Sequence, residues 1–189
     1  VPEFDKQGLE QLYNDLHKYT VKENGINQFL EKLNQLGVIF FVLPHLQKTY
    51  LDGAAFYYQN NPVIVYTARY KRIDNFWFTI AHEIAHILKH LDEKNTFFLD
   101  NFREEEVNDL ETEANQLAAE QLKHQEIITY LKAKINYLST TDIENCAKQL
   151  AIHPALIIGK LAFDKTISFA NQRLYNEEVL DLIDVNYLV

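Results

Sequence analysis

The segment 72–91 constrains the fold more than any other part of the chain, because it predicts one long helix with two chemically different sides. Apolar residues recur at helical spacing, and no glycine or proline interrupts them. The apolar side comprises Trp77, Ile80, Ile84, Ile87, Leu88 and Leu91. The other side comprises Thr79, His82, Glu83, His86 and His90. We therefore expect one side of this helix to pack in a core and the other to carry chemistry.

The polar side contains the motif His-Glu-x-x-His at positions 82–86. His82 and His86 stand about one helical turn apart, so both imidazole rings can reach a single metal ion. Glu83 lies beside that ion, where its carboxylate can take a proton from a water molecule on the metal. The motif therefore predicts a zinc site with His82 and His86 as ligands and Glu83 as the general base.

A catalytic zinc ion normally takes three protein ligands and keeps one position open for water. The next predicted helix, 104–123, carries Glu111 and Glu113 at the two margins of its apolar stripe. Apolar periodicity alone does not choose between these two carboxylates. His90 is excluded as a ligand on a straight helix, since two turns place it about 12 Å from His82 along the axis. It could still serve as a hydrogen-bonding group near the site.

The remaining pattern predicts a mixed fold. Helical periodicity covers 7–19, 25–36, 142–150 and 155–163, and β-branched or aromatic runs predict strands at 38–43, 54–58 and 63–66. The second and third strands form a hairpin with an asparagine-rich turn. This order places the last strand next to the metal helix, where an extended peptide could add to its edge.

Composition limits the class of protein. With 189 residues, 47% of them hydrophobic, the chain is long enough to bury a substantial core without disulfides. The only cysteine, Cys146, excludes an internal disulfide and favours a reducing, cytoplasmic compartment. No apolar run approaches the ~18 residues of a membrane span, so we expect no membrane partner. The net charge of -9 argues against holding nucleic acid by general phosphate attraction.

The two C-terminal helices, 142–150 and 155–163, have the spacing of a helix-turn-helix. The second helix offers only Lys160 as a cation, which is too little for phosphate contacts, so we favour a packed helical pair over DNA binding. The apolar tail 169–188 is expected to dock on the core or on a partner chain. We predict a metal-binding domain over 1–138 and a helical extension packed on it over 139–189.

Two stretches together resemble the ImmA/IrrE family of bacterial metallopeptidases. The first is Phe78-Thr-Ile-Ala-His-Glu-Ile-Ala-His-Ile-Leu-Lys-His90, and the second is Glu111-Thr-Glu-Ala-Asn-Gln-Leu-Ala-Ala-Glu120. The second motif of that family is typically E-x-x-A-N-x-F-A-A-E, and Leu117 stands here in place of its phenylalanine. The segment from Ala147 to Leu161 is similar to the tail of members that are fused to an upstream helix-turn-helix domain.

The resemblance implies a zincin-like α+β fold, with a small three-stranded sheet packed on the metal helix and on a second ligand-bearing helix. It also implies that the glutamate directly before Ala114 is the third ligand, which here is Glu113. Glu111 and Glu120 would then support the ligands from outside the coordination sphere. Zinc is the expected ion and manganese the alternative. Charge on the carbonyl oxygen would be stabilised by a nearby donor, for which the candidates are Tyr66, Arg69, Tyr70 and Arg72.

Two functions of different classes follow from these residues. The first is a zinc endopeptidase that cleaves a specific protein substrate. The resemblance implies that this substrate is a DNA-binding repressor or another transcriptional regulator, in a bacterial stress response, a mobile element or a toxin–antitoxin system. The second is a non-proteolytic regulatory or antitoxin module. It would keep the metal for structure or sensing and bind a toxin or a promoter through an N-terminal domain beyond this sequence. The intact Glu83 favours the first.

Overall fold

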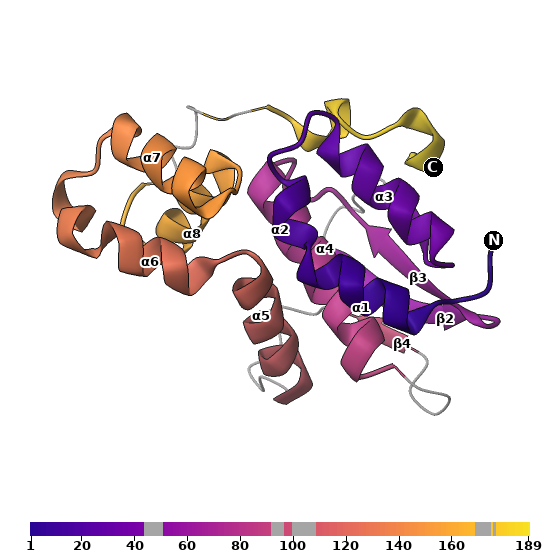
Figure 1. Ribbon diagram of the computed structural model, residues 1–189. Coiled ribbons are helices and arrows are strands. Elements are labelled where there is room, and N and C mark those ends of the chain that lie inside the picture. The colour runs from indigo at the N-terminus through magenta and orange to yellow at the C-terminus, as the bar shows by residue number, and fades with distance from the viewer. Residues whose placement is uncertain (44–50, 92–96, 100–108, 169–174, 176) are drawn as a thin grey trace.

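The protein combines helices with one small β-sheet, which confirms the predicted α+β class (Figure 1). The computed structural model describes residues 1–43, 51–91, 97–99, 109–168, 175 and 177–189. In these ranges the helices are α1 (Lys6–Asn14), α2 (Leu16–Tyr19), α3 (Gly25–Gln35), α4 (Ile73–Lys89), α5 (Asp109–Gln121), α6 (His124–Leu131), α7 (Thr140–Leu150) and α8 (Pro154–Phe163), with 3-10 turns η1 (Lys132–Tyr137), η3 (Val179–Asp181) and η4 (Val185–Tyr187). The strands are β1 (Ile39–Val42), β2 (Gly53–Tyr58), β3 (Asn61–Tyr66) and β4 (Phe97–Leu99).

The first predicted helix is interrupted in the structure. Asp5 caps α1, because its side chain accepts a hydrogen bond from the backbone N–H of Gly8 at 2.9 Å. The chain leaves helical geometry at Asp15, with φ -98° and ψ 2°, and resumes as α2. The prediction of one helix over 7–19 is therefore wrong at Asp15, although both pieces turn leucines into the core.

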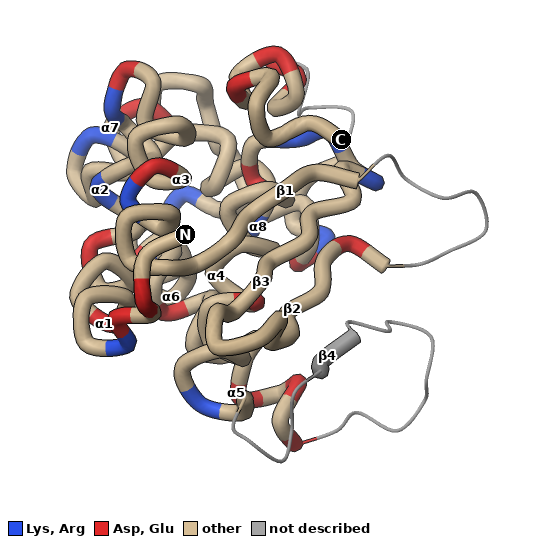
Figure 2. The backbone as a smooth tube through the Cα atoms, turned by 90° about the vertical axis from the view of Figure 1, so that its right-hand side faces the viewer, with Lys and Arg blue, Asp and Glu red and all other residues tan. Residues whose placement is uncertain are grey.

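The sheet has the strand order β1-β3-β2-β4 (Figure 2). β1 runs parallel to β3, and β2 is antiparallel to both β3 and β4. All three predicted strands are present, and β4 is a fourth that the sequence pattern did not predict. Gly53 lies opposite Tyr66 in the β2–β3 ladder, and Ala54 lies opposite Leu99 in the β2–β4 ladder.

The edge predicted for peptide addition is not where the sequence placed it. β3 lies in the interior of the sheet, since β1 pairs with one of its sides and β2 with the other. β2 is the strand between β3 and the short β4. The expectation that a peptide could add to the edge of the last strand before the metal helix is therefore wrong for β3.

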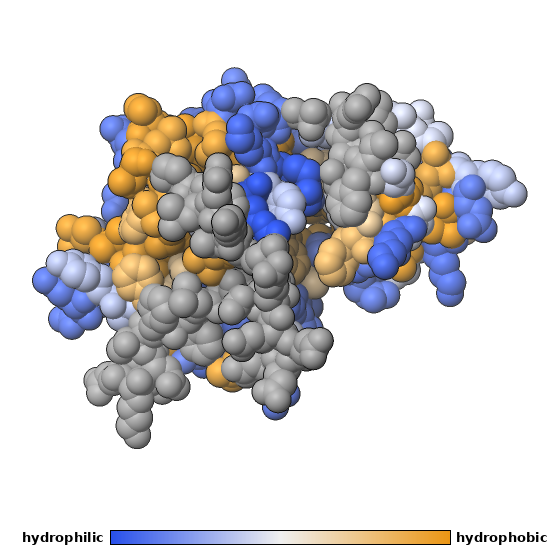
Figure 3. Space-filling view, turned by 180° about the vertical axis from the view of Figure 1, so that it is seen from behind, coloured by the Kyte–Doolittle hydropathy of each residue, from blue (hydrophilic) through white to orange (hydrophobic). Residues whose placement is uncertain are grey.

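The helices cover one face of the sheet. Strand residues such as Phe40, Ile64 and Tyr66 join the main hydrophobic core with the helices, and α4 lies against β2 and β3. A smaller cluster that includes Ala54 and Val65 lies on the other face. Figure 3, seen from behind, shows hydrophobic residues gathered on this outer side of the sheet. The two clusters give β1, β2 and β3 the alternation expected of a sheet that is packed on both faces.

The central helix is α4, which is buried on all sides along most of its length. Trp77 and Phe76 pack edge to face with ring centroids 5.2 Å apart in the main core. The polar side chains of Thr79, His82, Glu83 and His86 are buried as well. The sheet and α5 cover the side that was predicted to carry chemistry, so the polar groups lie inside the protein rather than on its surface.

α5 packs on α4 through small residues. Ala114 and Ala118 are fully buried, and they allow the two helices to approach closely. The predicted helix 104–123 is confirmed from Asp109 to Gln121, and its first residues, 104–108, lie outside the described ranges.

The substitution Ala118→Leu should therefore separate α5 from α4. An overpacked helix contact typically costs about 1–3 kcal/mol, so the free energy of unfolding should fall by that amount. Urea denaturation monitored by circular dichroism measures the change. The control is Gln116→Leu, which places the same side chain on the exposed side of α5. An equal decrease in the free energy of unfolding in both variants would contradict a close contact at Ala118.

The C-terminal helices form a packed pair. Ser139 caps α7 with a capping box, since it accepts from the backbone N–H of Asp142 and donates its own N–H to the Asp142 carboxylate. α8 is almost entirely buried and contacts α4, and Lys160 bonds to Asp164 at 2.8 Å. This geometry agrees with the prediction that the two helices form a packed pair rather than a DNA-binding helix-turn-helix. The predicted division at 138/139 stays a prediction.

The described part of the tail docks on the core. The backbone N–H of Val179 donates to the carbonyl of Lys71 at 2.8 Å, and that of Val189 donates to the carbonyl of Val42 at 3.2 Å. Val179 is fully buried. Docking on the core was one of the two predicted alternatives for this tail, and the described residues show it. Residues 169–174 and 176 of the predicted tail lie outside the described ranges. Among the described residues, no helix has both the length and the apolar character that crossing a bilayer requires.

Candidate metal centre

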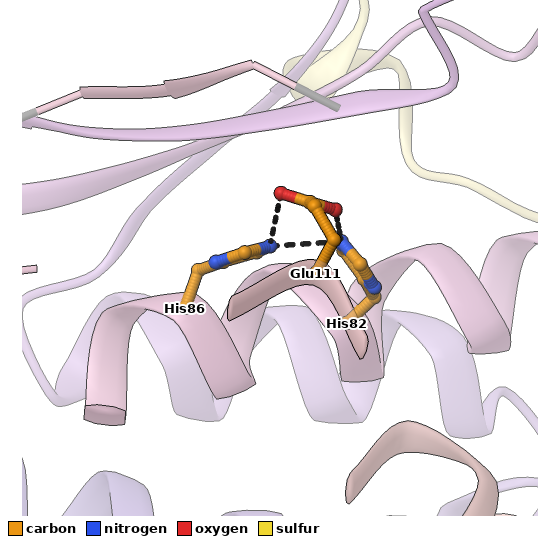
Figure 4. Close-up of side chains that lie close together, drawn as sticks. All are labelled: His82, His86 and Glu111. Atoms are coloured by element: carbon orange, nitrogen blue, oxygen red, sulfur yellow. Dashed lines mark hydrogen bonds and ion pairs between the residues drawn. The ribbon is translucent and has the colours of Figure 1, made fainter. Parts of the chain in front are cut away.

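The two histidines of the motif point to the same place. α4 is regular from Ile73 to Lys89, so His82 and His86 project from adjacent turns of one side. Their Nε2 atoms lie 2.9 Å apart, and both side chains are almost completely buried (Figure 4). The helical spacing thus brings together the two ligand atoms that the sequence predicted.

The third group at this point is Glu111, from the first turn of α5. Its two carboxylate oxygens each lie 3.2 Å from one Nε2 atom, Oε2 from His82 and Oε1 from His86. One ligand atom from each of the three residues can be chosen so that all lie within 4.8 Å of one another. Figure 4 shows the carboxylate of Glu111 directly above the two rings.

The structure contradicts the choice of Glu113 as the third group. The carboxylate of Glu113 lies 3.1 Å from Nε2 of His90, and its side chain is 54% exposed. The side of α5 that rests on α4 is set by Ala114 and Ala118, and Glu111 lies three and seven residues before them, on that same side. The rotation of α5 on α4 therefore turns Glu111, rather than Glu113, toward the two histidines.

Electrostatics fit this arrangement. Burial raises the pKa of the Glu111 carboxyl, but hydrogen bonds from His82 and His86 outweigh that effect and bring its pKa down to about 2. Burial lowers the pKa of His86 below its ordinary value, against the opposing influence of Glu111. Near neutral pH the site therefore offers a charged carboxylate and, at His86, a neutral imidazole, which are the forms that bind a metal ion.

Glu83 lies between α4 and the start of β2. Its side chain is fully buried, and in sequence it directly follows His82 on α4. A Cβ atom at Gly53 would lie 2.6 Å from Oε1 of Glu83 and 2.6 Å from Cγ2 of Thr79. The strand can approach the carboxylate this closely only because residue 53 has no side chain. Gly53 is a residue that the sequence reasoning missed, and its position at the start of a predicted strand was the available signal.

A second missed residue, Asn115, orients His82. The side-chain oxygen of Asn115 lies 3.0 Å from Nδ1 of His82. An amide oxygen only accepts, so Nδ1 of His82 is the ring nitrogen that donates to Asn115, and Nε2 is the ring nitrogen left to bind a metal ion. The available signal was the spacing of Glu111 and Asn115, four residues apart and hence on one side of α5.

The residues predicted to stabilise charge on the carbonyl oxygen have other partners in the structure. The hydroxyl of Tyr66 donates to the carbonyl oxygen of Tyr70 at 2.9 Å. Arg69 pairs with Asp52 at 3.5 Å and Arg72 with Asp74 at 3.0 Å, while both guanidinium groups lie over the ring of Tyr70. Their catalytic role stays a prediction.

Glu120 lies on the exposed side of α5, where it accepts a hydrogen bond from Gln116 at 3.1 Å. It is not one of the three groups that converge at the candidate metal site. Its predicted support of the ligands also stays a prediction.

The converging groups suit zinc. Two imidazole nitrogens and one carboxylate are the ligand set of many catalytic zinc sites, and imidazole favours zinc over the harder manganese ion. The three side chains come from rigid helices and are buried to different degrees, with Glu111 the most accessible at 22%. Within the described ranges, this is the group of histidine and carboxylate side chains whose geometry fits a metal ion.

Comparison with known protein families agrees with this geometry. The family model described as the IrrE N-terminal-like domain, peptidase family M78, matches residues 35–153, which is more than half of the chain. The protein belongs to this family. The matched region of this M78 member includes the sheet, α4, α5 and α7, and thus every residue of the candidate centre. A search among curated proteins found no match. Membership in M78 supports a metallopeptidase type of activity.

Proposed function

We propose that this M78 member is a zinc-dependent endopeptidase that cleaves one specific protein substrate in the cytoplasm of a bacterium. The single observation that carries the proposal is the convergence of His82, His86 and Glu111, and the buried Glu83 follows the first of these histidines on the same helix. The resemblance to the ImmA/IrrE family supports a transcriptional regulator as the substrate, in a stress response, a mobile element or a toxin–antitoxin system.

His82, His86 and Glu111 would hold the ion, and Glu83 would handle the proton. A bound zinc ion supplies a Lewis acid that polarises the peptide carbonyl and makes a water molecule acidic near neutral pH. The carboxylate of Glu83 takes a proton as the water oxygen bonds to the carbonyl carbon. It then delivers that proton to the leaving nitrogen as the C–N bond breaks. Burial of Glu83 keeps bulk water from competing for this transfer.

The test is co-expression with the regulator that a neighbouring gene encodes, comparing the wild type with Glu83→Gln. Loss of a positioned general base typically costs about 10²–10⁴-fold, so we expect cleavage to disappear while the zinc content stays the same. The control is Glu144→Gln, the same chemical change on the exposed side of α7. Cleavage that survives Glu83→Gln would refute the assignment. No cleavage by any variant would favour the non-proteolytic regulatory function.

A further inference from the structure

His90 and Glu113 form a hydrogen-bonded chain behind His86. Nδ1 of His90 lies 2.9 Å from Nδ1 of His86, and Nε2 of His90 lies 3.1 Å from Oε2 of Glu113. The side chain of His90 is only 3% exposed, so water competes little for these contacts. The hydrolytic scheme uses neither residue, although the chain begins at His86, a proposed ligand.

The hydrogen bonds of this chain agree with only one placement of protons when His86 binds a metal ion. If Nε2 of His86 is the ligand atom, the ring proton is on Nδ1. That N–H points at Nδ1 of His90, which must then be the unprotonated acceptor. His90 consequently carries its own proton on Nε2 and donates it to the carboxylate of Glu113. Each nitrogen of the two rings then acts as a metal ligand, a hydrogen-bond donor or a hydrogen-bond acceptor.

We infer that His90, held by Glu113, is a positioning residue that fixes the ring orientation and the metal-binding tautomer of His86. Hydrogen-bond partners of this kind make a ligand more basic and typically contribute about 10–100-fold to metal affinity. His82 is held in the corresponding way by Asn115, so the two imidazoles have different partners, one an amide and the other a histidine backed by a carboxylate. The inference rests on the proposed zinc site.

The matched pair His90→Asn and His90→Leu tests the inference. The two introduced side chains have similar size, and Oδ1 of asparagine is bonded to Cγ just as Nδ1 is in histidine. Asparagine therefore keeps an acceptor for the N–H of His86, whereas leucine removes it. The zinc dissociation constant of each purified variant is measured by competition with a chromophoric chelator, and circular dichroism of the metal-free proteins checks folding.

We expect His90→Leu to raise the dissociation constant of zinc on the order of 10- to 100-fold and His90→Asn to recover most of that loss. Equal losses in the two variants would show that His90 acts only by filling space. An unchanged dissociation constant in His90→Leu would show that it does not act on His86. Either result overturns the inference.

A second variant covers the case in which His90→Leu does not fold. Glu113 is half exposed on α5, so Glu113→Ala changes little packing. It should raise the zinc dissociation constant on the order of 10-fold, because His90 loses the acceptor that orients it. The control Glu144→Ala, exposed on α7, should leave the constant unchanged. An effect no larger than that of the control would overturn the inference.

The outcomes separate this inference from the proposed function. The variants at His90 and Glu113 are judged by zinc binding, whereas the peptidase assignment is judged by cleavage. If zinc affinities rank as expected but the wild type cleaves nothing, the peptidase assignment is contradicted and the role of His90 is supported. If the wild type cleaves its substrate while His90→Leu binds zinc normally, the role of His90 is contradicted and the peptidase assignment is supported.

Discussion

The substitution Glu111→Gln is expected to weaken zinc binding on the order of 100-fold. Structural zinc sites bind the ion with a free energy of about 10–16 kcal/mol. Shared among four ligands, this gives at least ~2.5 kcal/mol of binding free energy for each ligand. A neutral amide at residue 111 removes the anionic oxygens that lie 3.2 Å from the nitrogens of His82 and His86. Isothermal titration of the metal-free protein with zinc, or competition with a chelator, measures the loss.

The control is Glu113→Gln, the same change two residues further along α5. An amide oxygen at residue 113 still accepts from Nε2 of His90, so zinc affinity should stay within a few-fold of the wild type. The reverse ranking, with zinc lost from Glu113→Gln and kept by Glu111→Gln, would restore the assignment that the family motif implied.

Gly53→Ala is expected to reduce cleavage on the order of 100-fold while the protein still binds zinc. The added methyl group would lie 2.6 Å from Oε1 of Glu83, so the buried carboxylate has to move. A displacement of about 1 Å in a reacting group can cost 10²-fold in rate. The proposed ligands His82, His86 and Glu111 do not supply the atoms nearest to this position, so zinc affinity should not change. The rate is measured on the substrate found by co-expression.

The control for this variant is Gly159→Ala, which adds the same methyl group at a buried glycine of α8, where it would meet Asp74. That change should lower the free energy of unfolding without reducing the cleavage rate of the folded protein. A similar rate loss in both variants would mean that Gly53 acts through general packing rather than through Glu83.

The sequence predicted the parts of the site that depend on one helix. The spacing of His82 and His86 determines their relative position, because an α-helix allows little variation over four residues. The third group depends on how α5 is rotated against α4. Glu111 and Glu113 are about 200° apart on the helical wheel, and both border the apolar stripe. Only the packing of Ala114 and Ala118 decides which one turns inward.

The same distinction applies to the fold. The long apolar runs of the three predicted strands carry a clear local signal, and the structure contains all three. β4 has only three residues within an acidic segment, and it is a strand because it pairs with β2. The break at Asp15 was missed for the opposite reason, since the apolar spacing continues through it while the backbone turns.

The contact between α4 and α5 has a consequence for how metal and structure depend on each other. Two donors come from α4 and the third from α5, which follows the segment 92–108 in the chain. A cation held by all three would add a further link between parts of the polypeptide that are otherwise joined by the apolar contact at Ala114 and Ala118 and by the hydrogen bonds of Asn115 and Glu113. By thermodynamic linkage, the free energy gained in coordination also opposes detachment of α5. Loosening α5 would therefore release the ion and abolish the proposed peptidase activity in one step.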